Sequence, residues 1–238
     1  MKKVIVVGAT SGIGRGVAQL FAETGYIVGI TGRREELLRE LQYQYPDNFV
    51  VKVFDVTDTS STVRCLEALV TELGGLDLLL LSSGAGKRNE ELEYDIEKIS
   101  VDTNVVGFTC IADWTYNYFK KQGHGHFASI SSVAGLRGGR FAPAYNAGKA
   151  YQINYLQALR QKVHYQKLGM TITDIRPGFV DTEMAHGDGV FWSAPVEKAA
   201  KQIVKALEKK KSVVYITKRW RYVALFLKLI PRMLYEKL

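Results

Sequence analysis

Seven short apolar runs, separated by stretches of helical length, constrain the fold of this chain more than any other feature. The runs are rich in β-branched residues or leucine and lie at 4–7, 26–30, 49–54, 76–81, 126–130, 170–175 and 213–216. Stretches with helical periodicity include 14–24, 35–43, 61–73, 104–121, 144–167 and 195–208. Strands that are apolar along their whole length are typical of a parallel sheet covered by helices on both faces. The sequence therefore predicts an α/β fold with one doubly wound sheet of seven parallel strands.

The length and composition fit one domain with a C-terminal extension. The chain has 238 residues, of which 47% are hydrophobic and 24% charged, enough to bury a full core. It has five prolines and no Ser-rich linker, so we expect one domain over 1–217 and an extension over 218–238. The first apolar run breaks at Gly8, which indicates a strand rather than a signal peptide. No run approaches the roughly 20 apolar residues of a membrane-spanning helix, and we expect a cytoplasmic protein.

The net charge of +8 is concentrated at the C-terminal end. Residues 201–238 hold eleven Lys or Arg against Glu208 and Glu236, a local charge of +9, and subtracting this from the total leaves residues 1–200 at −1. Nucleic-acid binding by the body of the domain therefore has no electrostatic basis. Cys65 and Cys110 lie far apart without a CxxC spacing. We expect buried thiols in a reducing compartment and no metal site.

A glycine-rich turn, GATSGIG, directly follows the first predicted strand and opens the first helix. Such a turn lets backbone N–H groups approach a pyrophosphate at the positive end of the helix dipole. The position is where open α/β sheets bind dinucleotides, although a plain glycine-rich turn is the alternative. The expected cofactor contacts in this turn are Gly8, Thr10, Ser11, Gly12, Ile13 and Gly14.

The end of the second predicted strand distinguishes the two nicotinamide dinucleotides. An acidic residue there would accept hydrogen bonds from the adenosine ribose and repel a 2′-phosphate. This chain has Gly32 followed by Arg33 and Arg34, which leave room for a 2′-phosphate and offer guanidinium donors. The pattern favours NADP(H) over NAD(H). In the alternative interpretation the two arginines lie in solvent and pair with Glu35 or Glu36.

The next two predicted strands also end in residues suited to a dinucleotide. Asp55 can accept a hydrogen bond from an adenine amino group while the N–H of Val56 contacts the ring, although the neighbouring Asp58 fits a helix N-cap. The fourth strand is followed by SSGAG, in which small residues let the backbone approach the cofactor. We expect Ser83 and Gly84 to contact it.

The motif YxxxK occurs three times, at Tyr94 with Lys98, Tyr116 with Lys120, and Tyr145 with Lys149. Residues four apart share one face of a helix, so each lysine can approach its phenol and favour the ionised form. Only Tyr145 follows a strand that ends in a hydroxyl cluster, with Ser132 thirteen residues upstream. We expect Lys98 and Lys120 to be solvated surface charges.

Together these features resemble the classical short-chain dehydrogenase/reductase family, over residues 3–217. The family pattern TGxxxGxG matches from Gly8 onward, although Val7 stands where the family has Thr, and SSGA replaces its NNAG segment. The family's Asn, Ser, Tyr and Lys, and its PG turn with a following Thr, match Asn104, Ser132, Tyr145, Lys149, Pro177, Gly178 and Thr182. The resemblance implies a Rossmann-type fold and hydride transfer between NADP(H) and a carbonyl or secondary alcohol.

The resemblance also implies a role for each matched residue. Tyr145 would exchange a proton with the substrate oxygen, and Ser132 would hold that oxygen in place. Lys149 would lower the pKa of the phenol and bind ribose hydroxyls, while Asn104 would hold a water that links Lys149 to solvent. Further cofactor contacts would come from Tyr145, Lys149, Pro177, Gly178, Val180 and Thr182.

The substrate side of the site is less well defined by the sequence. In the family the loop after the PG turn covers the substrate, and here Phe191 and Trp192 give it an apolar wall. We expect them to contact substrate together with Ser132 and Tyr145; in the alternative they anchor the loop to the core. The sequence thus predicts an NADPH-dependent carbonyl reductase acting on a hydrophobic or lipid-like small molecule. The alternative is a catalytically idle NADP-binding or scaffold protein attached by its tail to a membrane or partner.

Two features point to contacts beyond the domain. The helical stretches 104–121 and 144–167 carry apolar side chains around most of their circumference, which predicts a homodimer or homotetramer unless the C-terminal segment covers them.

The segment 218–238 contains six consecutive apolar residues at 222–227 flanked by cations. It is too short to span a bilayer but fits peripheral binding to an anionic membrane, at the inner face of the cell membrane. Alternatively it folds over the substrate cleft or a subunit interface.

Overall fold

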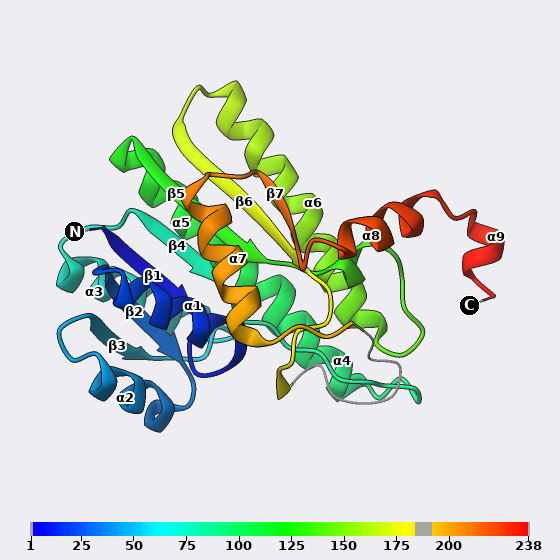
Figure 1. The fold of residues 1–238 in the computed structure, drawn as a ribbon, viewed down its shortest axis with the longest axis horizontal. Coiled ribbons are helices and arrows are strands. Elements are labelled where there is room, and N and C mark those ends of the chain that lie inside the picture. Colours follow the sequence, from blue (N-terminus) through cyan, green and yellow to red (C-terminus); the bar gives the residue numbers. More distant parts are fainter. Residues whose placement is uncertain (1, 184–191, 238) are drawn as a thin grey trace.

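The computed structural model describes residues 2–183 and 192–237 and contains a single seven-stranded parallel sheet (Figure 1). The strand order is β3-β2-β1-β4-β5-β6-β7, and every neighbouring pair is parallel. The strands are β1 (Lys3–Val7), β2 (Ile27–Gly32), β3 (Phe49–Val53), β4 (Leu78–Leu81), β5 (His124–Ile130), β6 (Gly169–Pro177) and β7 (Val213–Ile216). All seven predicted strands and their common direction are confirmed.

Helices cover both faces of the sheet. One layer contains α1 (Gly12–Glu23), α2 (Glu35–Gln44) and α7 (Val196–Glu208), and the other contains α3 (Thr59–Leu73), α5 (Phe108–Gln122) and α6 (Pro143–Tyr165). The alternation along β1 shows why both layers form: Val4 and Val6 pack toward the first layer, whereas Ile5 and Val7 pack toward the second. The doubly wound architecture follows from this two-sided burial.

The order in which strands are added to the sheet reverses direction between β1 and β4. The segments that follow these two strands hold part of the predicted site. β1 pairs with β2 on one side and with β4 on the other, so the connections leave in opposite directions at this point. Crevices at such switch points, beyond the carboxyl ends of the strands, are where open α/β sheets bind ligands. The fold therefore brings the ends of β1, β2, β4, β5 and β6 to one edge.

Several local expectations need correction or refinement. The helical stretch predicted at 104–121 starts earlier, after α4 (Tyr94–Val101), as the π-helical turn η1 (Asp102–Gly107), and only then becomes α5. Asp58 caps α3, because its carboxylate accepts a hydrogen bond from the N–H of Ser61 at 3.0 Å. The two cysteines are free thiols, as expected, but they are half-buried rather than buried.

The C-terminal segment forms two helices, α8 (Trp220–Leu229) and α9 (Arg232–Tyr235), which extend away from the sheet at one end of the molecule (Figure 1). Within the described residues, no helix has both the length and the apolar character to cross a membrane. Only part of α8 is buried, at Trp220 and Ala224. The segment is thus folded and docked on the domain by one face.

Candidate active site

The glycine-rich turn contacts the end of β4 through the backbone. Gly8 has a φ of +89°, and a Cβ atom there would lie 2.6 Å from the Ser83 nitrogen, so a larger residue would push the two segments apart. The N–H groups of Gly8 and Ala9 both donate to the Thr31 carbonyl oxygen, at 3.0 and 2.8 Å. The β1 turn is therefore held against both neighbouring strands, as a pyrophosphate cradle requires.

The start of α1 is arranged to receive an anion. Ser11 occupies the N-cap position, but its hydroxyl accepts a hydrogen bond from Arg34 at 2.7 Å instead of capping the helix. The N–H groups of the first turn thus keep their hydrogen-bonding capacity for a ligand. Of the remaining predicted turn residues, Ile13 packs against the core, and Gly12 lies beneath the methyl group of Thr182.

The two arginines after β2 lie at the edge of this cradle. One Arg34 nitrogen donates to Thr10 Oγ1 at 2.9 Å, and another lies 3.3 Å from Glu183 Oε2. Arg33 is exposed and lies 3.5 Å from Asp55 Oδ2. The alternative interpretation paired these arginines with Glu35 or Glu36. In the described structure Arg33 and Arg34 have the partners above instead, and Glu35 accepts from Arg39. The exposed cation of Arg33 and the hydrogen-bonded cation of Arg34 therefore follow Gly32 at this edge of the cradle.

Asp55 remains ionised at the end of β3. Burial raises the pKa of its carboxyl, but hydrogen bonds from the N–H and hydroxyl of Thr57, both 2.9 Å, and the charge of Arg33 outweigh burial and hold it below the usual value. The next residue, Val56, is buried. An ionised acceptor beside a buried backbone segment is compatible with the predicted adenine contact.

The residues directly after β6 lie against the glycine-rich turn. Gly178 donates to the Ile216 carbonyl at 2.6 Å, and Val180 is buried and forms an isolated bridge with Ala194. Pro177 ends β6, and Thr182 reaches Gly12. The predicted cofactor residues on this loop thus lie at the same edge as the glycine-rich turn.

Ser132 and Tyr145 come together at the ends of β5 and α6. Ser132 caps the short 3₁₀ turn η2 (Val133–Leu136), where its oxygen accepts from the N–H of Ala134 at 3.1 Å. Its hydroxyl also forms a hydrogen bond with the phenol of Tyr145. Burial raises the pKa of Tyr145, and the Ser132 hydrogen bond opposes that rise. A Cβ at Gly86 would lie 2.3 Å from the Tyr145 ring, so glycine is needed there for the close approach.

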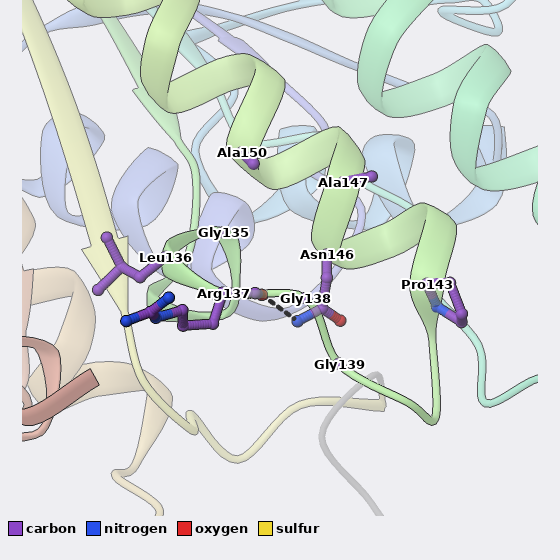
Figure 2. A pocket seen from close by; sticks show the side chains of 9 residues that line it. All are labelled: Gly135, Leu136, Arg137, Gly138, Gly139, Pro143, Asn146, Ala147 and Ala150. Atoms are coloured by element: carbon purple, nitrogen blue, oxygen red, sulfur yellow. Dashed lines mark hydrogen bonds between the residues drawn. The ribbon is translucent and has the colours of Figure 1, made fainter. Parts of the chain in front are cut away.

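Asn146 fixes the distance between these two residues. Its amide nitrogen donates to the carbonyl oxygens of Ala134 at 2.8 Å and Arg137 at 3.1 Å, which ties η2 to the first turn of α6. Figure 2 shows the hydrogen bond between Asn146 and Arg137 at the wall of a pocket of about 460 Å³ between the two elements. The pocket is lined by Gly135, Leu136, Arg137, Gly138, Gly139, Pro143, Asn146, Ala147 and Ala150.

Lys149 is buried beneath Tyr145, one turn further along α6. Its ammonium donates to the Ile130 carbonyl oxygen at 2.8 Å and to Gln152 Oε1 at 3.0 Å, and it lies 5.8 Å from the centre of the Tyr145 ring. Burial lowers the pKa of Lys149 to about 8, and the negative charge of Asp174 opposes the fall. The lysine thus titrates close to neutral pH.

Gln152 is a site residue that the sequence interpretation missed. It is buried, and while its Oε1 accepts from Lys149, its Nε2 donates to the Asn104 carbonyl oxygen at 3.0 Å. The Asn104 side chain in turn binds Ala85, donating to its carbonyl at 2.5 Å and accepting from its N–H at 3.2 Å. The Gln152 amide thus connects the backbone carbonyl of Asn104 to the Lys149 ammonium. The signal was available: a residue three positions after Lys149 lies on the same helix face.

The other two YxxxK pairs lie outside this constellation. Tyr94 is exposed, and Lys98 forms an ion pair with Asp102 on the surface. Tyr116 is buried and donates to Gln166 Oε1 at 2.6 Å, whereas Lys120 is exposed. The expectation that both lysines are surface charges is confirmed.

Of the two predicted substrate aromatics, Phe191 lies outside the described residues. Trp192 is half-exposed, and its ring lies under the guanidinium of Arg219, 5.2 Å from the ring centre. Arg219 also donates to the Trp192 carbonyl at 2.8 Å. The end of the loop is therefore attached to the C-terminal segment.

The arrangement has the parts that proton exchange with a carbonyl oxygen requires. A hydroxyl, a phenol and an ammonium converge beside the glycine-rich turn. The cradle, the arginines and Asp55 fit the pyrophosphate, a 2′-phosphate and adenine of a dinucleotide. No cluster of three or more His, Cys, Asp or Glu side chains suited to a metal occurs among residues 2–183 and 192–237.

Comparison with known proteins identifies relatives over most of the chain. An uncharacterized oxidoreductase of Myxococcus xanthus is 34% identical over 188 residues, which cover 77% of this chain and 74% of that protein. An uncharacterized oxidoreductase of Staphylococcus saprophyticus is 30% identical over 211 residues, covering 86% of this chain and 88% of that protein. These two matches thus each cover more than three quarters of this chain.

Solved structures show the same fold at lower identity. A serine dehydrogenase in its closed form, complexed with NADP⁺, superimposes with a TM-score of 0.80 at 24% identity, covering 90% of this chain and 94% of that one. The apo form of LigD from Sphingobium sp. strain SYK-6 gives a TM-score of 0.81 at 22% identity, covering 95% and 94%.

The sequence profile described as "short chain dehydrogenase" matches residues 2–189. The matched range includes the glycine-rich turn, Ser132, Tyr145, Lys149 and the PG turn. The chain therefore belongs to the short-chain dehydrogenase family of oxidoreductases.

Proposed function

We propose that this protein is an NADP(H)-dependent oxidoreductase that interconverts a carbonyl group and a secondary alcohol. The observation that carries the proposal is the convergence of Ser132, Tyr145 and Lys149 beside a glycine-rich turn flanked by arginines. A catalytically idle scaffold would not need a buried lysine beneath Tyr145, because burial of an ammonium costs free energy. NADPH oxidation with a panel of carbonyl compounds tests the activity directly.

When bound, the nicotinamide supplies or accepts the hydride. Tyr145 acts as the acid in carbonyl reduction, since its raised pKa keeps the phenol protonated at neutral pH. Ser132 donates a hydrogen bond to the same oxygen and holds it against the phenol. Charged Lys149 stabilises the phenolate that remains after proton transfer. Lys149 also binds ribose hydroxyls when it leaves one of its present acceptors.

The cofactor preference rests on Arg33 and Arg34. Arg34 is held by Thr10 and Ser11 and supplies a fixed positive charge at the phosphate turn. Arg33 has only an exposed contact with Asp55 and is free to turn toward a 2′-phosphate beside Gly32. We propose NADP(H) as the cofactor, with adenine beside Asp55 and Val56 and the remaining contacts from Ser83, Gly84 and the loop after β6.

The substrate is proposed to be a hydrophobic or lipid-like small molecule in a cytoplasmic enzyme. Trp192 contributes an aromatic surface at the end of the loop that follows β6, and that loop is linked to the apolar C-terminal helices. An apolar surface with few polar groups is typical of pockets for such ligands.

A homo-oligomer is proposed from the outer surfaces of α5 and α6. Half-buried aromatic rings lie there in two stacked pairs, Trp114 with Tyr118 at 5.4 Å and Tyr151 with Tyr155 at 5.6 Å between ring centres. Ala158 is exposed on α6. Aromatic rings that are incompletely covered in one chain are enriched at interfaces between subunits.

The first prediction concerns the acid. Tyr145→Phe removes only the hydroxyl, so turnover should fall by about 100-fold or more while NADPH binding, measured by fluorescence titration, is retained. Tyr94→Phe, in an exposed YxxxK motif, is the matched control and should keep full activity. Equal inactivation of the Tyr94→Phe enzyme with its fold intact would mean that the wrong tyrosine has been assigned.

The second prediction concerns the 2′-phosphate. Arg33→Ala should weaken NADPH binding about tenfold or more and leave NADH binding nearly unchanged, because a charge-assisted contact with the extra phosphate is lost. Arg39→Ala removes the same charge from an exposed position on α2, where Arg39 pairs with Glu35, and should change neither affinity. Equilibrium titration with each dinucleotide measures the effect; an equal loss for both dinucleotides in Arg33→Ala contradicts the assignment.

The third prediction concerns the bridge through Gln152. Loss of the acceptor in Gln152→Leu removes a hydrogen bond from the charged form of Lys149 and should lower its pKa further below 8. A carboxylate in Gln152→Glu should raise that pKa. The high-pH limb of kcat/KM should therefore shift to lower pH in the first variant and to higher pH in the second. Shifts in the same direction, or a uniform loss at all pH values, would assign Gln152 to packing alone.

The fourth prediction concerns assembly. The protein should sediment as a dimer or tetramer at micromolar concentration, and Ala158→Arg should reduce its mass because a charged side chain is placed in the proposed interface. Tyr43→Arg on the exposed side of α2 serves as the control. A strictly monomeric wild-type protein in analytical ultracentrifugation would refute the interface.

A further inference from the structure

The outward side of the C-terminal helices is apolar. Tyr222, Leu225, Phe226 and Leu229 of α8 are each between 55% and 75% exposed. On a helix with 3.6 residues per turn these four positions form one stripe, opposite the buried Trp220 and Ala224. Met233 and Leu234 of α9, which follows α8 in the chain, are also exposed. We call these six side chains the apolar stripe. Surface helices ordinarily present polar side chains to water on this side.

The stripe faces outward because the opposite side of α8 is fixed to the domain. A Cβ at Gly178 would lie 2.0 Å from the Trp220 indole, so the indole packs directly on the PG turn, and it meets Phe179 edge to face at 5.4 Å. Arg137 donates to the carbonyl oxygens of Leu227 at 2.8 Å and Ile230 at 2.7 Å, at the end of α8. The buried face of α8 therefore packs on the domain, and the apolar stripe is available to a binding partner.

Exposed cations flank the apolar stripe along the sequence. Residues 218–238 hold six Lys or Arg and one acidic residue, Glu236, a formal side-chain charge of +5. The cations nearest the stripe in sequence are all exposed: Lys218, Arg219, Arg221, Lys228 and Arg232. Glu236 pairs with Arg232 at 2.6 Å and Arg219 lies over the Trp192 ring, whereas Lys218, Arg221 and Lys228 are exposed beside the stripe in sequence. The occupant of this surface must combine an apolar region with negative charge.

We infer that α8 and α9 bind the surface of an anionic lipid bilayer. The ten residues of α8 span about 15 Å at 1.5 Å per residue, so the helix lies in the plane of the interface rather than across it. The apolar stripe would enter the boundary between headgroups and acyl chains, and the cations would contact anionic headgroups. A second copy of this chain fits less well, because a symmetric contact would place each positive segment against its equivalent.

The inferred membrane surface adjoins the segments that form the substrate side of the active site. Trp220 rests on the PG turn, Arg137 follows η2, and Arg219 holds Trp192. A bilayer bound to α8 would therefore lie beside the loop that is expected to cover substrate. Membrane binding itself does not depend on the proposed activity; only the further step, entry of a lipid-like carbonyl substrate from the bilayer, rests on the proposed function.

Vesicle co-sedimentation of the full-length protein tests the inference. The protein should bind vesicles of equal parts phosphatidylcholine and phosphatidylglycerol, should be released by high salt, and should bind pure phosphatidylcholine at least tenfold more weakly. The double variant Phe226→Glu and Leu229→Glu alters two exposed side chains and should lose binding to the anionic vesicles. Tyr43→Glu introduces a carboxylate at an aromatic residue on α2 that is more exposed than Phe226 or Leu229, and it should bind like the wild type.

The outcomes separate the inference from its alternatives. Wild-type protein that stays in solution with anionic vesicles overturns the inference, as does unchanged binding of the double variant. If the wild-type protein does not bind vesicles and the double variant has a lower oligomeric mass than the wild type in ultracentrifugation, the stripe is a subunit contact. NADPH titration of each variant shows whether the domain remains folded, and a protein that binds vesicles but reduces no carbonyl refutes the proposed function while leaving the membrane surface in place.

Discussion

The buried ammonium of Lys149 is the interaction on which the arrangement of the site depends. It joins α6, which carries Tyr145, to the last carbonyl of β5, next to the segment that carries Ser132. A buried ammonium is stable only while its acceptors are in place, so the helix and the strand end keep one relative position. Its lowered pKa follows from the same burial. Burial of this ammonium thus explains two properties at once: the fixed position of α6 relative to the end of β5, and the lowered pKa of Lys149.

Around this point, hydrogen bonds from side chains to backbone carbonyls position the loops. Asn104 binds the backbone of Ala85, Gln152 binds the carbonyl of Asn104, and Asn146 binds the η2 segment. Amides suit this task because each offers both a donor and an acceptor. The π-helical turn at Asn104 brings its side chain and its carbonyl to different partners, and such turns recur at functional sites. The loops at the carboxyl ends of the strands are therefore held by polar contacts, whereas the strands are held by apolar packing.

The sequence predicts much of this fold because a few residue patterns have one stable interpretation. Seven apolar runs between helices indicate a parallel sheet, and a glycine-rich turn after the first run places the cofactor edge. Among the three YxxxK motifs, the Ser132 spacing singled out Tyr145, and the structure brings these two together. Gln152 was missed because its spacing from Lys149 indicates a shared helix face but no partner; the contact of its amide with the Asn104 carbonyl reveals its use. The half-burial of the cysteines likewise depends on tertiary packing, which residue type alone does not define.

The C-terminal segment shows how a local pattern gains meaning from its docking. Its sequence leaves open whether the apolar residues cover the cleft or face outward, because either face of a short helix can be buried. Trp220 and Arg137 decide between them: the indole occupies the space above Gly178, and the guanidinium binds the carbonyls that end α8. Because the Arg137 carbonyl also accepts from Asn146, which neighbours Tyr145, two side chains separate α8 from the phenol of Tyr145. The orientation of the apolar stripe is therefore a consequence of the same loop that positions Ser132 and Tyr145.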